Sequence, residues 1–324
     1  MLRFSLCGMI ATILGLVAAA SAADNGFQTW LEKMALRAET EGISRDFVDL
    51  AFHGLQPSKD VLRLERQQPE FSEALISYLD RVVTPERIAT GRRRLRQHRN
   101  ILDDIGAEYS VQPRFIVALW AIESDFGRFQ GRHPTVQSLA TLGFGGRRRQ
   151  FFQRELLHLL QLLEQENMRP AELFGSWAGA IGQCQFMPST FRRLAIDHDG
   201  DGHRDIWHNH GDIFASIANF LAHLGWRDDQ TWGRQVSIPA DLEESLAGLL
   251  RVRKSLAAWQ SLGVRRMDGT DLPERDIDAS LLLPKRRGGR AYLVYKDFRI
   301  LLKWNNSAYF ALSVGRLADR LRAY

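Results

Sequence analysis

Glu123 is the residue whose setting most clearly suggests chemistry. It stands in the last turn of a predicted helix over residues 113–126, whose other side chains are nearly all apolar. A carboxylate there is partly removed from water and faces the negative end of the helix dipole. Both effects disfavour the charged form, so we expect an acid that stays protonated near neutral pH. Such an acid can protonate the leaving oxygen of a glycosidic bond; the alternative is a structural ion pair, for example with Arg128.

A second carboxylate close to Glu123 is not evident. Asp125 follows two residues later, which corresponds to about 200° of rotation around a helix, so its side chain points away from that of Glu123. A retaining glycosidase needs two close carboxylates. The spacing therefore favours a mechanism with a single acid.

The segment from Gly175 to Thr190 combines small residues, amides and aromatic rings in GSWAGAIGQCQFMPST. Small residues let another backbone or a ligand approach closely. The amides of Gln183 and Gln185 can bind hydroxyl and acetamido groups, and Trp177 offers a flat face for a sugar ring. The segment indicates sugar binding; the alternative is a tight connection between two helices.

The segment DHDGDGHRD, residues 197–205, resembles the first half of an EF-hand loop. Acids occupy positions one, three, five and nine, and Gly202 occupies position six. Position twelve is His208 instead of glutamate, and Asp212 could replace it from a longer loop. Calcium or an empty structural loop are both open, whereas the histidine spacing does not favour zinc. The candidate ligands are Asp197, Asp199, Asp201, His203 and Asp212.

Helices are expected to position these residues. Apolar residues recur at three- and four-residue steps from Phe27 to about Leu102, with Thr84 as an N-cap before Pro85. Further helices are predicted at 148–166, 212–224 and 308–321. The helix over 113–126 is apolar on all sides, which predicts a buried central helix that Gly127 ends.

The chain after Trp226 has a different pattern. Short strands are predicted at 236–239, 279–283 and 291–295, with a basic turn at 284–289. The predicted fold class is mainly α (α+β). The expected division is a signal peptide at 1–22, a helical region at 23–104, a catalytic core at 105–230 and a β-rich segment with a closing helix at 231–324.

Composition and the N-terminus narrow the functional class. The chain has 324 residues, 45% of them hydrophobic, and a formal net charge of +5, which suits an anionic partner. Arg3, a short apolar run and Ala20-Ser21-Ala22 indicate a cleaved secretory signal; an uncleaved anchor is the alternative. We therefore expect a periplasmic, monomeric protein without a stable membrane span or a nucleic-acid partner. Only Cys184 would remain after cleavage, so no intrachain disulfide is expected.

Taken together, these motifs resemble the membrane-bound lytic murein transglycosylase B family, the lysozyme-like glycoside hydrolase family 103. The resemblance covers nearly all of the chain after residue 22 and lies in Ala121 to Gly127, Ser138 to Leu142, Gly175 to Thr190, Asp197 to Trp207 with Asp212 to Trp226, Gln68 to Phe71, and Trp304 to Ser307.

The resemblance implies a lysozyme-like helical core and a reaction on peptidoglycan glycan strands. Glu123 would protonate the β-1,4 bond between N-acetylmuramic acid and N-acetylglucosamine, then take a proton from the C6 hydroxyl to form a 1,6-anhydro end. No cofactor is implied for the chemistry. The substrate-binding residues implied are Ser176 and Gln185, with Tyr78, Phe220, Asn305, Tyr309 or Phe310 along the cleft and Arg147 and Arg148 near the peptide stem.

Three features depart from the family pattern. Cys184 stands where threonine or a small residue is expected, and the loop from Trp207 to Asp212 is one residue longer than expected, which puts calcium in question. The missing lipid-attachment cysteine indicates a soluble member. Two rival functions are open: a muramidase that adds water at the same bond, and a non-catalytic wall-binding or scaffold protein.

Overall fold

The computed structural model describes residues 26–67, 75–246, 250–284 and 290–322. Three sequence expectations lie outside these residues: the signal peptide at 1–22, the motif from Gln68 to Phe71, and most of the basic turn at 284–289. Within the described ranges, no helix combines the length and hydropathy needed to cross a bilayer.

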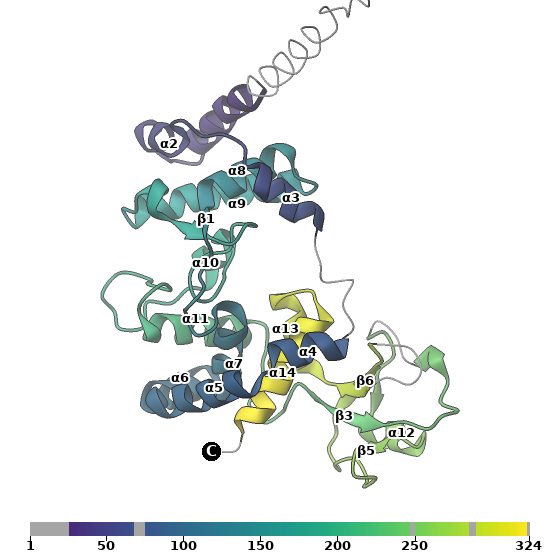
Figure 1. Cartoon of the computed structure of the whole chain (residues 1–324). Coiled ribbons are helices and arrows are strands. Elements are labelled where there is room, and N and C mark those ends of the chain that lie inside the picture. Colours follow the sequence, from purple (N-terminus) through teal and green to yellow (C-terminus); the bar gives the residue numbers. More distant parts are fainter. Residues whose placement is uncertain (1–25, 68–74, 247–249, 285–289, 323–324) are drawn as a thin grey trace, which may run out of the picture. The chain divides into compact units, whose positions relative to one another are not determined.

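The chain forms two compact units, and each is built from two separate stretches of sequence. Unit 1 comprises Met1–Gln68 and Gln130–Arg193, and unit 2 comprises Pro69–Phe129 and Leu194–Tyr324. Helices dominate both units (Figure 1), which confirms the mainly α prediction. The contiguous division expected at residues 104 and 230 stays a prediction.

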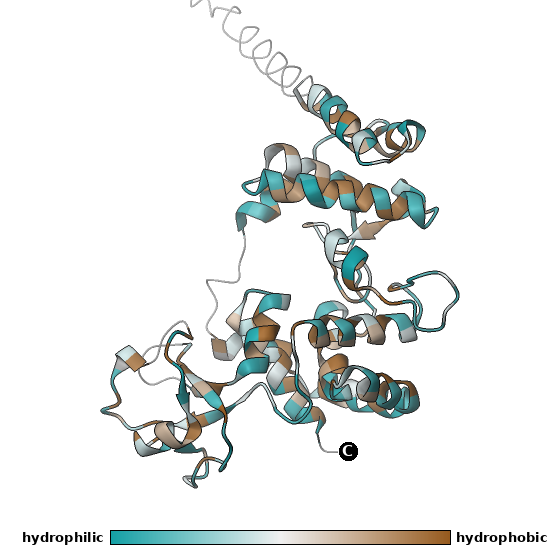
Figure 2. Cartoon of the chain, turned by 180° about the vertical axis from the view of Figure 1, so that it is seen from behind, coloured by the Kyte–Doolittle hydropathy of each residue, from teal (hydrophilic) through white to brown (hydrophobic). Residues whose placement is uncertain are grey.

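Unit 1 is a helical unit in which α8 packs against α9. Residues 26–40 are helical. Brown and teal segments alternate along α9 in Figure 2, as its amphipathic sequence requires. The remaining elements are α2 (Arg45–Phe52), α3 (Lys59–Gln67), β1 (His133–Pro134), α8 (Thr135–Gly145), α9 (Arg149–Gln165), η2 (Pro170–Glu172), β2 (Phe174–Gly175) and α10 (Pro188–Leu194).

Unit 2 is organised around α7 (Pro113–Ser124), where every residue from Phe115 to Ala121 is buried. This confirms the predicted central helix. The helices that pack against α7 are α5 (Pro85–Gln97), α6 (Arg99–Tyr109), α11 (His210–His223) and α14 (Ala308–Leu321). Further helices of the unit are α4 (Leu75–Val82), η3 (Glu244–Leu246), α12 (Leu256–Ser261) and α13 (Lys296–Trp304). Thr84 caps α5 as predicted, accepting a hydrogen bond from the Arg87 backbone N–H at 3.2 Å.

The strands predicted after Trp226 form one antiparallel sheet in unit 2, with order β4-β6-β7-β3-β5. Val294 lies opposite Gly233 on one side and opposite Ser280 on the other. Trp259, Leu281 and Leu293 belong to the apolar core beneath the sheet. The strands are β3 (Gly233–Ser237), β4 (Lys254–Ser255), β5 (Arg265–Arg266), β6 (Asp278–Leu282) and β7 (Ala291–Val294).

Candidate active site

The backbone after Glu123 leaves the helix abruptly. α7 ends at Ser124, and Asp125, Phe126 and Gly127 follow with φ values of 50°, 60° and 86°. The predicted end at Gly127 is therefore two residues late, because the chain enters the left-handed region already at Asp125. The buried Ser124 hydroxyl accepts the Gly127 backbone N–H at 3.1 Å. Left-handed backbone at non-glycine residues is uncommon and costs free energy, and it often occurs at functional sites.

The Glu123 carboxylate receives a hydrogen bond from a residue far away in the sequence. Its Oε1 accepts the indole N–H of Trp304 at 2.5 Å, across 181 residues. Both side chains are half-buried. Trp304 ends α13, and its ring centroid lies 4.5 Å from that of Phe220 in α11. An indole N–H can only donate, so Trp304 binds the Oε1 oxygen of Glu123 as an acceptor.

The carboxylate of Asp125 forms ion pairs with two arginines. Its two carboxylate oxygens accept hydrogen bonds from Arg128 at 2.9 Å and from Arg87 at 3.4 Å. Arg128, the arginine considered as an alternative partner for Glu123, thus pairs with Asp125. Among the described residues, this leaves Asp125 bound in a structural ion pair and supports the single-acid interpretation of Glu123.

Aromatic residues predicted for the cleft meet within unit 2. The rings of Tyr78 in α4 and Tyr309 in α14 lie 5.6 Å apart. Of the two alternatives at this point of the chain, Tyr309 is half-buried, whereas Phe310 is only 5% exposed and belongs to the core. Asn305 follows Trp304 directly and is half-buried.

The segment predicted to bind sugar in unit 1 is held by its own backbone. Ser176 exchanges two hydrogen bonds with Ala180: its backbone N–H donates to the Ala180 carbonyl at 2.8 Å, and its hydroxyl accepts the Ala180 N–H at 3.0 Å. Gly131 has φ +104° and no room for a Cβ, which would overlap the backbone of Gly175. The close approach of two backbones explains why glycine stands there.

Gln185 is bound at the turn that closes this segment. It has a φ of 49°, and its side-chain amide donates to the carbonyls of Gly182 at 2.9 Å and Gln130 at 3.1 Å. Its side-chain oxygen is the remaining acceptor for a ligand. Cys184 is fully buried, so its thiol is not open to solvent.

The two arginines predicted to contact the peptide stem are exposed in unit 1. Arg147 donates to the Glu65 backbone carbonyl at 2.7 Å, and its backbone N–H donates to the Glu65 carboxylate at 2.8 Å. Arg148 lies over the ring of Phe151 at 4.1 Å. Their role toward substrate stays a prediction, as do the roles of Ser176 and Gln185.

The acidic loop brings three of its predicted ligands together. Oxygen atoms of Asp197, Asp199 and Asp212 lie within 4.8 Å of one another. Burial raises the pKa of Asp212; the backbone N–H groups of His198 and Asp205 oppose this, and the neighbouring charges of Asp199 and Asp197 add to it. Three carboxylates so close repel one another unless a cation neutralises them, and their hard oxygen donors fit calcium.

The other two predicted ligands do not join this group. Asp201 instead accepts the His203 backbone N–H at 2.8 Å and is exposed. No histidine lies in the three-carboxylate group formed by described residues. The ring of His210 lies tilted against that of His98, with the ring centroids 4.6 Å apart, and burial lowers the pKa of His210. The zinc alternative is therefore not supported.

Trp304 is the residue of this site that the sequence did not identify. It was noticed only as part of a matching motif with Asn305. A tryptophan at the end of a helix carries no local sign of its partner, because the bond to Glu123 depends on how α14 packs against both α13 and α7. The aromatic character of Trp304, next to Asn305 in the matching motif, was the available sign in the sequence that this residue belongs to the site.

Comparison with known proteins places the chain among wall-active enzymes. Residues 26–319 match the model of the Transglycosylase SLT domain. Membrane-bound lytic murein transglycosylase B of Escherichia coli strain K12 is 30% identical over 253 residues, which cover 76% of this chain and 67% of that protein.

Solved structures agree over most of the chain. SltB3 from Pseudomonas aeruginosa, in complex with NAG-anhNAM-pentapeptide, has a TM-score of 0.87 and 42% identity, covering 92% of this chain and 80% of that chain. The lytic transglycosylase Slt35 of Escherichia coli, in complex with calcium, has a TM-score of 0.78 and 27% identity, covering 92% of this chain and 93% of that one.

Proposed function

This chain belongs to the Transglycosylase SLT domain family, and we propose that it is a peptidoglycan lytic transglycosylase. The reaction is cleavage of the β-1,4 bond between N-acetylmuramic acid and N-acetylglucosamine, with a 1,6-anhydromuramic acid end as product. The observation that supports this assignment is the setting of Glu123, a half-buried carboxyl at the end of a buried helix. Trp304 donates a hydrogen bond to it, and the nearby Asp125 is already paired with arginines.

In the first step, Glu123 gives its proton to the glycosidic oxygen while the bond to the anomeric carbon breaks. The acetamido oxygen of the muramic acid stabilises that carbon, so no second carboxylate is needed. In the second step, the ionised Glu123 takes the proton of the same sugar's C6 hydroxyl, whose oxygen bonds to the anomeric carbon. The acid is restored and no water is consumed.

Trp304 orients the acid in both steps. The indole N–H donates to Oε1 at 2.5 Å and so fixes the orientation of the carboxyl group. The packing of Trp304 on Phe220 keeps the indole in place while Glu123 serves the leaving group and the C6 hydroxyl in turn.

The other predicted residues act on binding. We assign Ser176 and Gln185 to the sugar, with the Gln185 amide oxygen and the Ser176 hydroxyl as polar partners for its substituents. Tyr78 and Tyr309 offer ring faces to pyranose rings, Asn305 lines the cleft with them, and Arg147 and Arg148 face the peptide stem. Phe220 was also predicted to line the cleft, but it is only 8% exposed, so its role is to support Trp304 from below. Each of these roles awaits substitution and measurement of KM.

The deciding experiment is mass analysis of muropeptides released from purified sacculi. The transglycosylase reaction yields anhydromuramic ends, which are lighter by one water than muramidase products. Products with reducing muramic ends would establish the rival hydrolase instead. Absence of any released product, with binding to sacculi retained, would identify a wall-binding protein.

We further propose that Asp197, Asp199 and Asp212 bind calcium. The three oxygen donors meet in the structure, and the related Slt35 is known in complex with calcium. Calcium would neutralise the three carboxylates and hold Asp212, at the start of α11, to the loop before it. Its role is structural, because Glu123 supplies the chemistry.

The place of action that fits this substrate is the periplasm. We infer that residues 1–22 direct export and are then removed, leaving a monomeric enzyme on the wall side of the membrane. N-terminal sequencing of the protein recovered from periplasmic extracts tests this: a mature start near residue 23 is expected, and an intact Met1 in that fraction contradicts it.

A further inference from the structure

A cavity of about 640 Å³ lies in unit 2, apart from the catalytic carboxyl. Its walls include Pro113 and Arg114, the first residues of α7, together with parts of α5, α6 and β3. Glu123 stands ten residues further along α7, which at 1.5 Å per residue places the two sites about 15 Å apart. A group bound in the cavity therefore does not touch the reacting bond.

The lining of this cavity is strongly basic. It contains three aspartates, namely Asp103, Asp228 and Asp229. It also contains six arginines: Arg96, Arg99, Arg114, Arg234, Arg275 and Arg322. Their excess of positive charge, inside a concave surface where the field is concentrated, favours an anion. Arginine fits a carboxylate particularly well, because its planar guanidinium can donate two parallel hydrogen bonds.

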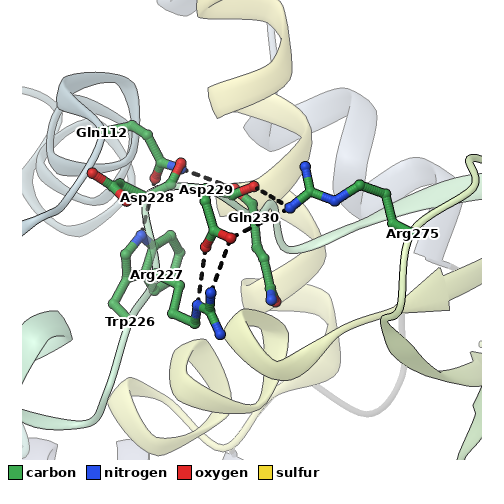
Figure 3. A network of polar contacts seen from close by, with 7 residues as sticks. All are labelled: Gln112, Trp226, Arg227, Asp228, Asp229, Gln230 and Arg275. Atoms are coloured by element: carbon green, nitrogen blue, oxygen red, sulfur yellow. Dashed lines mark hydrogen bonds and ion pairs between the residues drawn. The ribbon is translucent and has the colours of Figure 1, made fainter.

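One wall of the cavity is a network of polar contacts. Figure 3 shows Asp229 between two arginines: its carboxylate accepts from Arg227 Nε at 2.9 Å and from Arg275 at 3.3 Å. Gln112 holds the same loop by donating to the carbonyls of Asp228 at 2.6 Å and Gln230 at 2.8 Å. Asp229 therefore already has arginine partners and competes little for a ligand's place in the cavity.

Arg114 is the residue of the lining that lies least favourably in its own helix. It is a cation in the first turn of α7, where the helix dipole disfavours positive charge. A bound anion offsets this cost.

We infer that this cavity binds free carboxylates of a peptidoglycan stem peptide. The inference rests on the proposed function, since that substrate carries its carboxylates on short peptides. A volume of about 640 Å³ is in the range of small-molecule sites and exceeds what a single small ion needs. Apolar lining residues such as Leu95, Pro273 and Ile277 provide contact for the aliphatic parts of such a peptide. The enzyme thus holds a peptide-bearing strand at a second point.

The test is calorimetric titration of the full chain with a synthetic stem tetrapeptide, with its fully amidated form, and with citrate. The wild type is expected to bind the free peptide at least about tenfold more tightly than the amidated one, since charge-assisted pairs are the strong ones. Exchange of Arg114 and Arg234 for glutamine is expected to lower that affinity about tenfold or more. Arg93→Gln, which removes one positive charge at an exposed position of α5 outside the cavity and so matches Arg114→Gln, should leave it unchanged.

Arg234 also donates to the buried Tyr295 hydroxyl at 2.7 Å, so the double variant has a risk of misfolding. In that case the single variant Arg114→Gln is measured instead, and Arg114→Lys, which keeps the positive charge, is its control. Equal affinity of wild type and Arg114→Gln, or of free and amidated peptide, overturns the inference. Citrate binding as tightly as the peptide overturns the stem-peptide assignment and leaves a general anion pocket.

The outcome is separable from that of the proposed function. For Arg114→Gln, kcat/KM on peptide-bearing sacculi should fall relative to kcat/KM on glycan stripped of peptides, compared with wild type and Arg93→Gln. Anhydro products with an unchanged ratio refute the cavity and leave the transglycosylase assignment intact. Carboxylate-dependent peptide binding without anhydro products would support the cavity as a peptide site and refute the transglycosylase assignment.

Discussion

The segment of unit 1 proposed to bind sugar and the proposed catalytic acid of unit 2 are built in different ways. Between Ser176 and Gln185, most hydrogen bonds join residues a few positions apart, the bond from Gln185 to the Gln130 carbonyl being the exception, and glycines set the path of the chain. The Glu123 carboxyl is instead held by Trp304, 181 residues away, in a unit where α14 packs against both α7 and α13. The first site depends on local backbone geometry, and the second depends on a tertiary contact between side chains.

This difference teaches which changes each site should tolerate. A backbone-built segment should fail when a side chain is added to a crowded glycine, whatever that side chain's chemistry. A side-chain-built site should keep its fold but lose function when a single donor or acceptor is removed. The following experiments are arranged from the largest expected effect to the smallest.

Glu123→Gln should remove nearly all activity and leave the fold intact. The amide oxygen can still accept the Trp304 N–H, while the transferable proton is lost. General acid–base catalysis typically contributes ~100- to 10,000-fold, and here one residue serves both steps. The measurement is release of anhydromuropeptides, with circular dichroism as the check on folding.

The matched control for that variant is Asp125→Asn, because Asp125 is bound by Arg87 and Arg128. Its turnover should stay within a few-fold of wild type, with a loss confined to stability. A comparable collapse of turnover in both variants would end the single-acid interpretation.

Gly131→Ala should destabilise the protein by roughly 2–4 kcal/mol, since the new Cβ meets the backbone of Gly175 and the residue has φ +104°. Urea unfolding and kcat/KM are the measurements. Gly42→Ala is the control: it has φ +89° and nothing within 4 Å of the new Cβ, so it isolates the left-handed penalty of about 1 kcal/mol. Equal destabilisation by the two variants would contradict the crowding argument.

Calcium should raise the melting temperature, because it binds the folded loop and not the unfolded chain. At a hundredfold excess over Kd the stabilisation is roughly 2.7 kcal/mol. Activity in calcium-free buffer at low temperature should persist. Because the ligands of this loop lie close together in the sequence, the experiment tests whether local spacing alone can assemble a calcium site.

Asp199→Asn should abolish the calcium shift, whereas Asp201→Asn should retain it, since Asp199 belongs to the three-carboxylate group and Asp201 does not. Differential scanning fluorimetry of both variants, from EDTA to millimolar calcium, distinguishes them. A wild-type protein shown to be metal-free, with a melting temperature that calcium does not change, would mean the loop is closed by its own side chains.

Trp304→Phe should lower kcat about tenfold and leave KM nearly unchanged. Phenylalanine keeps the ring contact with Phe220 but lacks the N–H that binds Glu123, and a hydrogen bond to a charged group is worth ~1.5–3 kcal/mol. The split between kcat and KM distinguishes orientation of the acid from a loss of substrate binding.

The control is Trp259→Phe, which removes the indole bond to the Ala279 carbonyl, 3.0 Å long, in the core of the sheet region. It should lower stability without changing kcat. A kcat equally reduced in both variants would assign the effect to general destabilisation.

Several parts of this protein followed from the sequence alone. The all-apolar stretch of α7, the cap at Thr84 and the three strands after Trp226 were predictable, because periodicity and capping are properties of neighbouring residues. Asp212 was also identified as an acid that could complete the loop, since it lies a short chain length from Asp197. Glu123 stood out because a lone carboxylate ended an apolar helix.

Only the tertiary structure decided the remainder. It paired Trp304 with Glu123, assigned Arg128 to Asp125, excluded Asp201 from the carboxylate group and gathered six arginines around one cavity. Apart from the Arg128–Asp125 pair, which spans three residues, these contacts follow no helical or strand period and join segments far apart in the chain. The physical reason is that local sequence determines which face of an element is apolar, whereas the packing of whole elements determines which polar side chains meet.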